Sequence, residues 1–101
     1  MEYIETLEET ILKLHGCKAE YVGTVPVTET FQRKTVWEGD VEVFRILGHE
    51  QAKRCYAWSH ETESGKCYLA VLEIPPIDSP QTAVQAAIVN EFKSKQKPEG
   101  G

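Results

Sequence analysis

Residues 53–74 read KRCYAWSHETESGKCYLAVLEI, and this stretch decides the fold. Two runs rich in aromatic and β-branched residues flank Thr62-Glu63-Ser64-Gly65, where Gly65 suits a left-handed turn conformation. The pattern predicts antiparallel strands over 53–61 and 66–74, joined as a hairpin. The Pro75-Pro76 pair that follows ends the second strand, because proline cannot donate to a sheet ladder.

Two more strands are expected upstream, over 18–31 and from about Thr35 to Leu47, because apolar and polar residues alternate there. Pro26 places the first of them at a sheet edge or at a bulge. One face of that strand is expected to carry the apolar residues Ala19, Tyr21, Val25, Val27 and Phe31, and the other face polar residues.

The segment 32–34 is interpreted as a three-residue turn between these two strands. A turn of that length sets Val25 opposite Val41 and Glu29 opposite Trp37. The apolar faces of the two strands then match, which supports a hairpin.

Helices are expected at both ends of the chain. The first covers 2–15 with an apolar stripe and stops at Gly16, and the second has Ser79 as its cap and Pro80 at its first position. The stripes are Ile4, Leu7, Ile11 and Leu14 in the first helix, and Ala83, Val84, Ala87, Ile88 and Phe92 in the second.

The fold class is therefore α+β in αββββα order, a four-stranded antiparallel meander packed with N- and C-terminal helices. One domain is expected over 1–93, followed by a flexible polar tail over 94–101. Composition agrees with a globular domain, since 41% of the residues are hydrophobic and 27% are charged.

Charge and cysteine content limit the partners and the location. The net charge of −5 argues against nucleic acid, whose phosphates require an excess of lysine and arginine. No apolar run reaches membrane-spanning length and the acidic N-terminus does not suit a secretory signal, so a cytoplasmic protein without a membrane partner is expected. Three cysteines, an odd number, are interpreted as reduced thiols.

Four segments together resemble a family of small uncharacterised bacterial proteins, some of them carried on mobile gene cassettes. They are Val25–Phe31, Thr35–Gly39, Lys53–His60 and Ile74–Pro76. The resemblance spans most of the chain and implies a bacterial origin. It implies no activity, and no functional residue is carried over from it.

Candidate catalytic and metal-ligating residues centre on His60. Ser59-His60-Glu61 contains the residue types of a hydrolytic triad, but neighbours on a strand point to opposite faces. If Glu61 pairs with Lys66, His60 lies opposite Cys67 as half of a zinc site, but the other ligands are missing. No catalytic residue, metal or cofactor is therefore assigned.

An acidic row on the second long strand, Glu38, Asp40 and Glu42, has two interpretations. In a hydrophobic cleft, such carboxylates can do acid and base chemistry. On an open surface, they are a solvated face. Glu38, Asp40 and His60 are accordingly the candidate polar lining of a pocket between sheet and helix.

The leading functional hypothesis is a non-enzymatic binding or interaction module that forms a homodimer through its sheet. One face of the 53–74 hairpin carries Tyr56, Trp58, Leu69 and Val71, a patch that monomeric proteins rarely expose. The alternatives are that one helix covers each face of the sheet, and that the protein is a small-molecule binder or small acid/base enzyme.

Overall fold

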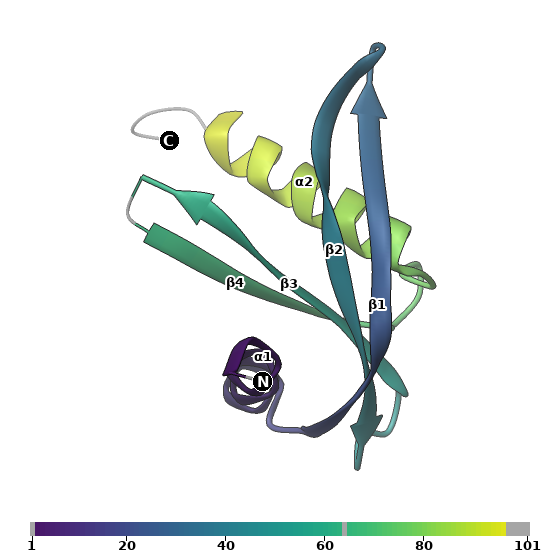
Figure 1. Cartoon of the computed structure of the whole chain (residues 1–101). Coiled ribbons are helices and arrows are strands. Elements are labelled where there is room, and N and C mark those ends of the chain that lie inside the picture. The colour runs from purple at the N-terminus through teal and green to yellow at the C-terminus, as the bar shows by residue number, and fades with distance from the viewer. Residues whose placement is uncertain (1, 64, 97–101) are drawn as a thin grey trace.

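One antiparallel sheet between two helices forms the architecture (Figure 1). The computed structural model describes residues 2–63 and 65–96, with the backbone alone at 62 and 90–96. Its elements in chain order are α1 (Glu2–His15), β1 (Lys18–Phe31), β2 (Lys34–Leu47), β3 (Arg54–Thr62), β4 (Gly65–Leu72) and α2 (Pro80–Gln96). The strands follow each other across the sheet as β1-β2-β3-β4, so the α+β meander is confirmed.

The β3–β4 hairpin has the register expected from its turn. Glu61 pairs with Lys66, and His60 lies opposite Cys67. Gly65 has a φ of +122°, which favours glycine over any residue with a side chain. Local turn chemistry was therefore sufficient to set the register.

The turn between β1 and β2 has two residues rather than the three expected. Gln32 and Arg33 have φ values of 51° and 67°, the left-handed conformation that a type I′ hairpin turn requires at both positions. Val36 then bulges from β2 and supplies the extra residue that the shorter turn omits. The pairings expected for Val25 and Glu29 are confirmed, although a bulge restores them instead of a longer turn.

A second bulge, at Val22, changes which side chains of β1 lie on the same face of the sheet. The pairing shifts by one residue between Tyr21 and Gly23, so the side chains exchange faces there. Ala19 packs toward α1, whereas Val27 packs toward α2. The prediction of a single apolar face along β1 is wrong, because strict alternation cannot cross a bulge.

The helices cover opposite faces of the sheet (Figure 1). The core beneath α1 contains Leu7, Ile11, Cys17, Phe44, Ile46, Cys55 and Ala57. The core beneath α2 contains Val27, Val41, Val43, Tyr56, Trp58, Ala83 and Val84. Tyr56 and Trp58 are each only 2% exposed, so the prediction that their face is left uncovered is wrong. The alternative, with one helix on each face, is confirmed.

The helix ends follow their sequence signals. The Gly16 amide donates to the Leu12 carbonyl at 2.8 Å, with a left-handed Gly16. The Thr82 amide donates to Ser79 Oγ at 3.2 Å, and the Ser79 amide donates to Thr82 Oγ1 at 3.0 Å. Both expected helix boundaries at these ends are confirmed.

Leu14 in α1 and the C-terminal end of α2 differ from expectation. Leu14 is exposed, so the prediction that it belongs to the apolar stripe of α1 is wrong. The backbone of α2 continues to Gln96, into the segment assigned to the polar tail. The side chain of Phe92 and all of 97–101 lie outside the described residues.

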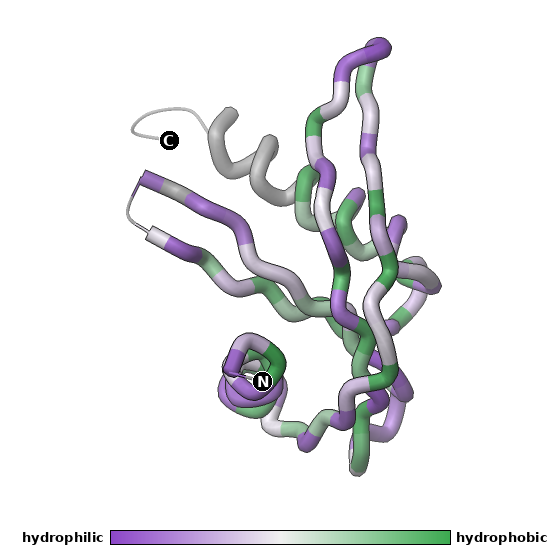
Figure 2. The backbone as a smooth tube through the Cα atoms, in the orientation of Figure 1, coloured by the Kyte–Doolittle hydropathy of each residue, from purple (hydrophilic) through white to green (hydrophobic). Residues whose placement is uncertain are grey.

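The sheet opens between its two hairpins. The ladder between β2 and β3 joins only 42–45 to 54–57, whereas β1 and β2 pair along almost their full length. Beyond Glu42 and Ala57 the two hairpins diverge, with α2 crossing behind them (Figure 1). Figure 2 shows hydrophobic and hydrophilic residues interspersed along both hairpins.

Replacing Gln32 by Asn and Arg33 by Gly together should stabilise the protein. Both residues now hold left-handed conformations that cost a residue with a side chain roughly 1 kcal/mol each, and Asn-Gly adopts them readily. Urea unfolding should show a free energy of unfolding higher by about 1 kcal/mol at an unchanged m-value. An unchanged or lower midpoint would argue against the two-residue turn.

Trp58→Glu should prevent folding, because it places a carboxylate in the core beneath α2 without a partner. Circular dichroism and thermal unfolding would show the loss of a cooperative transition. Val89→Glu, at a half-exposed position of α2, is the control and should leave folding intact. A folded Trp58→Glu monomer would show that α2 does not cover this face.

Candidate functional site

The candidate site is an apolar pocket where the opened sheet meets α2. It measures about 500 Å³, within the usual range for a ligand-binding cavity. Its walls come from β2, β3, β4, the loop after β4, and α2. The lining residues are Trp37, Trp58, His60, Leu69, Val71, Ile77, Val84, Ala86, Ala87 and Ile88.

Both tryptophans of the chain line this pocket. Their rings meet edge to face, with centroids 5.9 Å apart and planes at 67°. Trp37 also lies along its own strand, over Gly39: a Cβ atom built on Gly39 would lie 3.1 Å from the Trp37 ring. Gly39 therefore makes the room that lets the indole lie against β2 and reach Trp58.

The pocket exists because strand pairing stops while helix packing continues. A continued ladder would pair Val41 with Trp58 and Gly39 with His60, but these residues have no partner across β2 and β3 within the described chain. On the opposing helix, Ala86 and Ala87 are too small to fill the space between the strands. Diverging strands and short helix side chains together leave a hollow.

The residues predicted as a dimer interface are divided between core and pocket. Tyr56 is buried beneath α2. Trp58 is equally buried and also lines the pocket. Leu69 and Val71 are half-buried and line the pocket beside it. The structure thus brings three of the four residues together at one hollow beneath the helix.

The residues predicted as polar pocket lining are separated by the sheet. His60 is half-buried and lines the pocket. Glu38 and Asp40 are exposed, and their side chains lie on the face of β2 opposite Trp37. Glu42, the third member of the acidic row, is buried and accepts a hydrogen bond from Thr24 Oγ1. Among the described lining residues, His60 alone has an ionisable side chain.

A tyrosine and a carboxylate form a polar pair within the α2 core. Tyr56 Oη donates a hydrogen bond to Glu73 Oε2. Burial first, and then this bond and the charge of Glu73, raise the pKa of Tyr56 to about 12. The phenol therefore stays protonated at neutral pH, which suits a structural hydrogen bond rather than proton transfer.

Ser59 and the three histidines of the chain lie in separate surroundings. Ser59 Oγ donates to Tyr3 Oη at 3.1 Å on the α1 side, while His60 faces the pocket. His15 Nε2 lies 2.9 Å from the Ala70 carbonyl oxygen, and His49 Nδ1 accepts the Ala52 amide at 2.9 Å. Across the described residues, no group of three or more His, Cys, Asp or Glu side chains is placed to hold a metal ion.

The three cysteines are free thiols in two different environments. Cys17 and Cys55 are buried in the α1 core, whereas Cys67 is exposed on β4. Burial, with the neighbouring Cys17, raises the pKa of Cys55 to about 12. Cys55 is therefore a packing residue and not a nucleophile.

Comparisons with protein-family models, with curated proteins and with solved structures find no match to this chain. In the part of the chain that the structure describes, no helix combines the length and the apolar character needed to cross a membrane.

Tyr56→Phe should make the stability less sensitive to alkaline pH. The folded-state pKa of Tyr56, about 12, exceeds its ordinary value of 10.0, so its contribution is complete below pH 10 and is lost as pH rises toward 12. Urea unfolding between pH 10 and 12 measures the effect. The free energy of unfolding of the unaltered protein should fall with pH more steeply than that of the variant, by roughly 1 kcal/mol per pH unit. Identical slopes would show that Tyr56 titrates alike in both states.

Proposed function

We propose that this protein is a non-enzymatic binding module whose ligand places apolar groups in the pocket between α2 and the opened sheet. The observation that carries the proposal is the convergence of Trp37 and Trp58 on one largely apolar hollow. Aromatic side chains supply large, rigid contact surfaces at little cost in conformational entropy. Such a hollow with few polar groups is typical of ligand recognition.

The chemistry of the lining favours binding over catalysis. His60 brings one imidazole to the pocket, while Glu38 and Asp40 point away from it. An acid/base mechanism needs a second group positioned on the substrate, and nucleophilic catalysis needs an activated side chain next to its base. His60 is better suited to orient a polar or anionic part of an otherwise apolar ligand.

A homodimer and a cytoplasmic location stay predictions. The argument for a dimer came from the face that carries Tyr56 and Trp58, and α2 now buries those two side chains. Any contact between copies would have to use other surfaces than these two side chains. Light scattering across a range of protein concentrations would measure the oligomeric state directly.

The pocket can be tested with anilinonaphthalene sulfonate, an apolar fluorescent probe that carries one negative charge. Since both tryptophans line the pocket, binding should quench their emission by energy transfer and saturate at one probe per chain. Ala86→Phe fills the hollow from α2 and should weaken binding by about tenfold or more.

Val89→Phe is the matched control, because it adds an aromatic ring to an exposed part of the same helix, outside the pocket lining. It should bind the probe as the unaltered protein does. The probe also binds partly unfolded proteins that expose apolar surface. Each variant should therefore show cooperative thermal unfolding, so that probe binding can be assigned to the pocket. Equal binding by Ala86→Phe, or no saturable binding at all, would reject the proposed function.

A further inference from the structure

The opened sheet leaves backbone edges without ladder partners beside the pocket. Segment 34–41 of β2 and segment 58–61 of β3 face the gap between the hairpins, and neither has a strand partner on that side within the described residues. In a strand, alternate residues direct their N–H and C=O groups to the same edge. The upper half of β2 therefore presents a row of donors and acceptors toward the gap, as an edge strand does.

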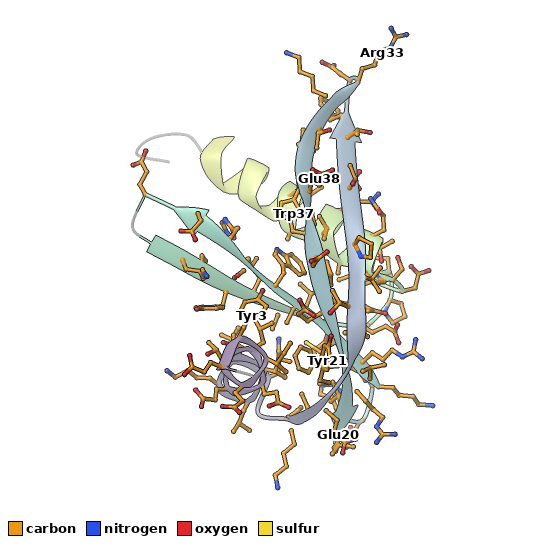
Figure 3. All side chains as sticks on the ribbon, viewed as in Figure 1. Tyr3, Glu20, Tyr21, Arg33, Trp37 and Glu38 are labelled. Atoms are coloured by element: carbon orange, nitrogen blue, oxygen red, sulfur yellow. The ribbon has the colours of Figure 1, made fainter. Side chains whose placement is uncertain are left out.

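The two faces of this gap differ in character. On the α2 side lies the pocket, with Trp37, Trp58 and Leu69 in its walls. On the other side, Glu38 and Asp40 are exposed on β2. Figure 3 labels Trp37 and Glu38 on the length of β2 that borders the gap. A strand added along β2 would direct every second side chain into the apolar pocket. The side chains between them would point toward the carboxylates of Glu38 and Asp40.

We propose that the ligand is an extended segment of a partner protein, added as a strand along residues 34–41 of β2, with alternating apolar and basic side chains. The inference rests on the proposed function, because the apolar side chains occupy the same pocket. Added strands gain affinity from main-chain hydrogen bonds and specificity from pockets for alternate side chains. Opposite charges across neighbouring strands then favour lysine or arginine beside Glu38 and Asp40.

The charge of the protein also argues against a second copy of the chain as the occupant of this site. The protein carries a net charge of −5, and the face beside the gap carries two exposed carboxylates. Repulsion therefore disfavours the chain's own acidic surface at this place. A small apolar molecule would fill the hollow but leave the edge of β2 to solvent, so a polypeptide uses both features of the site.

The test uses a blocked peptide of about seven residues, near the usual strand length, that alternates valine and lysine. It should displace anilinonaphthalene sulfonate from the pocket and slow amide hydrogen exchange in segment 34–41. A matched peptide with glutamate in place of lysine should bind more weakly by about tenfold. Exchange in α1, on the other side of the sheet, serves as the internal reference.

Two N-methylated versions of the peptide test the main-chain bonds. Valines and lysines alternate, so methylating all valine amides blocks one edge of the added strand and methylating all lysine amides blocks the other. One version should lose about tenfold or more in affinity relative to the other, because only one edge faces β2. Equal affinities would overturn the strand geometry.

Charge reversal tests the role of the acidic face. The double variant Glu38→Lys with Asp40→Lys should reverse the preference, so that the glutamate peptide binds better. The matched control, Glu9→Lys with Glu50→Lys, changes the net charge equally at exposed positions in α1 and in the loop after β2. It should keep the preference for lysine.

The outcomes distinguish this inference from the proposed function. If the fluorescent probe binds in the pocket but the peptide neither displaces it nor protects segment 34–41, strand addition is wrong and the binding pocket stands. If neither the probe nor the peptide binds, both strand addition and the proposed function are wrong. Displacement without a difference between the N-methylated peptides would indicate a ligand held by its side chains alone.

Discussion

The architecture depends on the short ladder that joins β2 to β3. Within the described residues, the β2–β3 ladder joins only 42–45 to 54–57, and one further main-chain hydrogen bond runs from the Ile46 amide to the Lys53 carbonyl at 2.8 Å. A connection this short leaves side-chain packing to fix the angle between the hairpins. The helices supply that packing, α1 over Phe44 and Cys55 on one face, and α2 over Tyr56 and Trp58 on the other. Each helix thus packs where the hairpins meet.

Sequence was sufficient where the local signal is strong, as it is not at the Gln32-Arg33 turn. The Thr62–Gly65 turn gives the register of the second hairpin, and Ser79 with Gly16 marks helix ends. It was insufficient at the bulges of Val22 and Val36, where one residue leaves the ladder: Gly23 follows the first bulge but the alternation was read straight through it, and no glycine or proline lies next to the second. A bulge exchanges the faces of the residues beyond it, so reading strict alternation in β1 misplaced Ala19 and Tyr21 relative to Val27.

The pocket was only partly predictable, for a related reason. His60, Trp58, Leu69 and Val71 follow from the hairpin register, which places them on one face. Their hollow depends on where the β2–β3 ladder ends, a tertiary property that no local pattern encodes. Glu38 and Asp40 were grouped with His60 because strand and charge patterns do not show which face the helix covers. Gly39 after Trp37, and the paired Ala86 and Ala87, are the signals that could have indicated an open site.

The tryptophan pair links the opening of the sheet to the chemistry of the site. Trp37 lies over Gly39, where a Cβ atom would be only 3.1 Å from its ring, and this ring meets Trp58 on the α2 side of the gap. Two indole rings in this place fill the space behind the strands, while Ala86 and Ala87 opposite them do not. A core selected for stability alone would close such a hollow with larger side chains, because unfilled apolar volume costs stability. The proposed binding function accounts for this arrangement, because a ligand would complete the packing between Ala86 and Ala87 and the two indole rings.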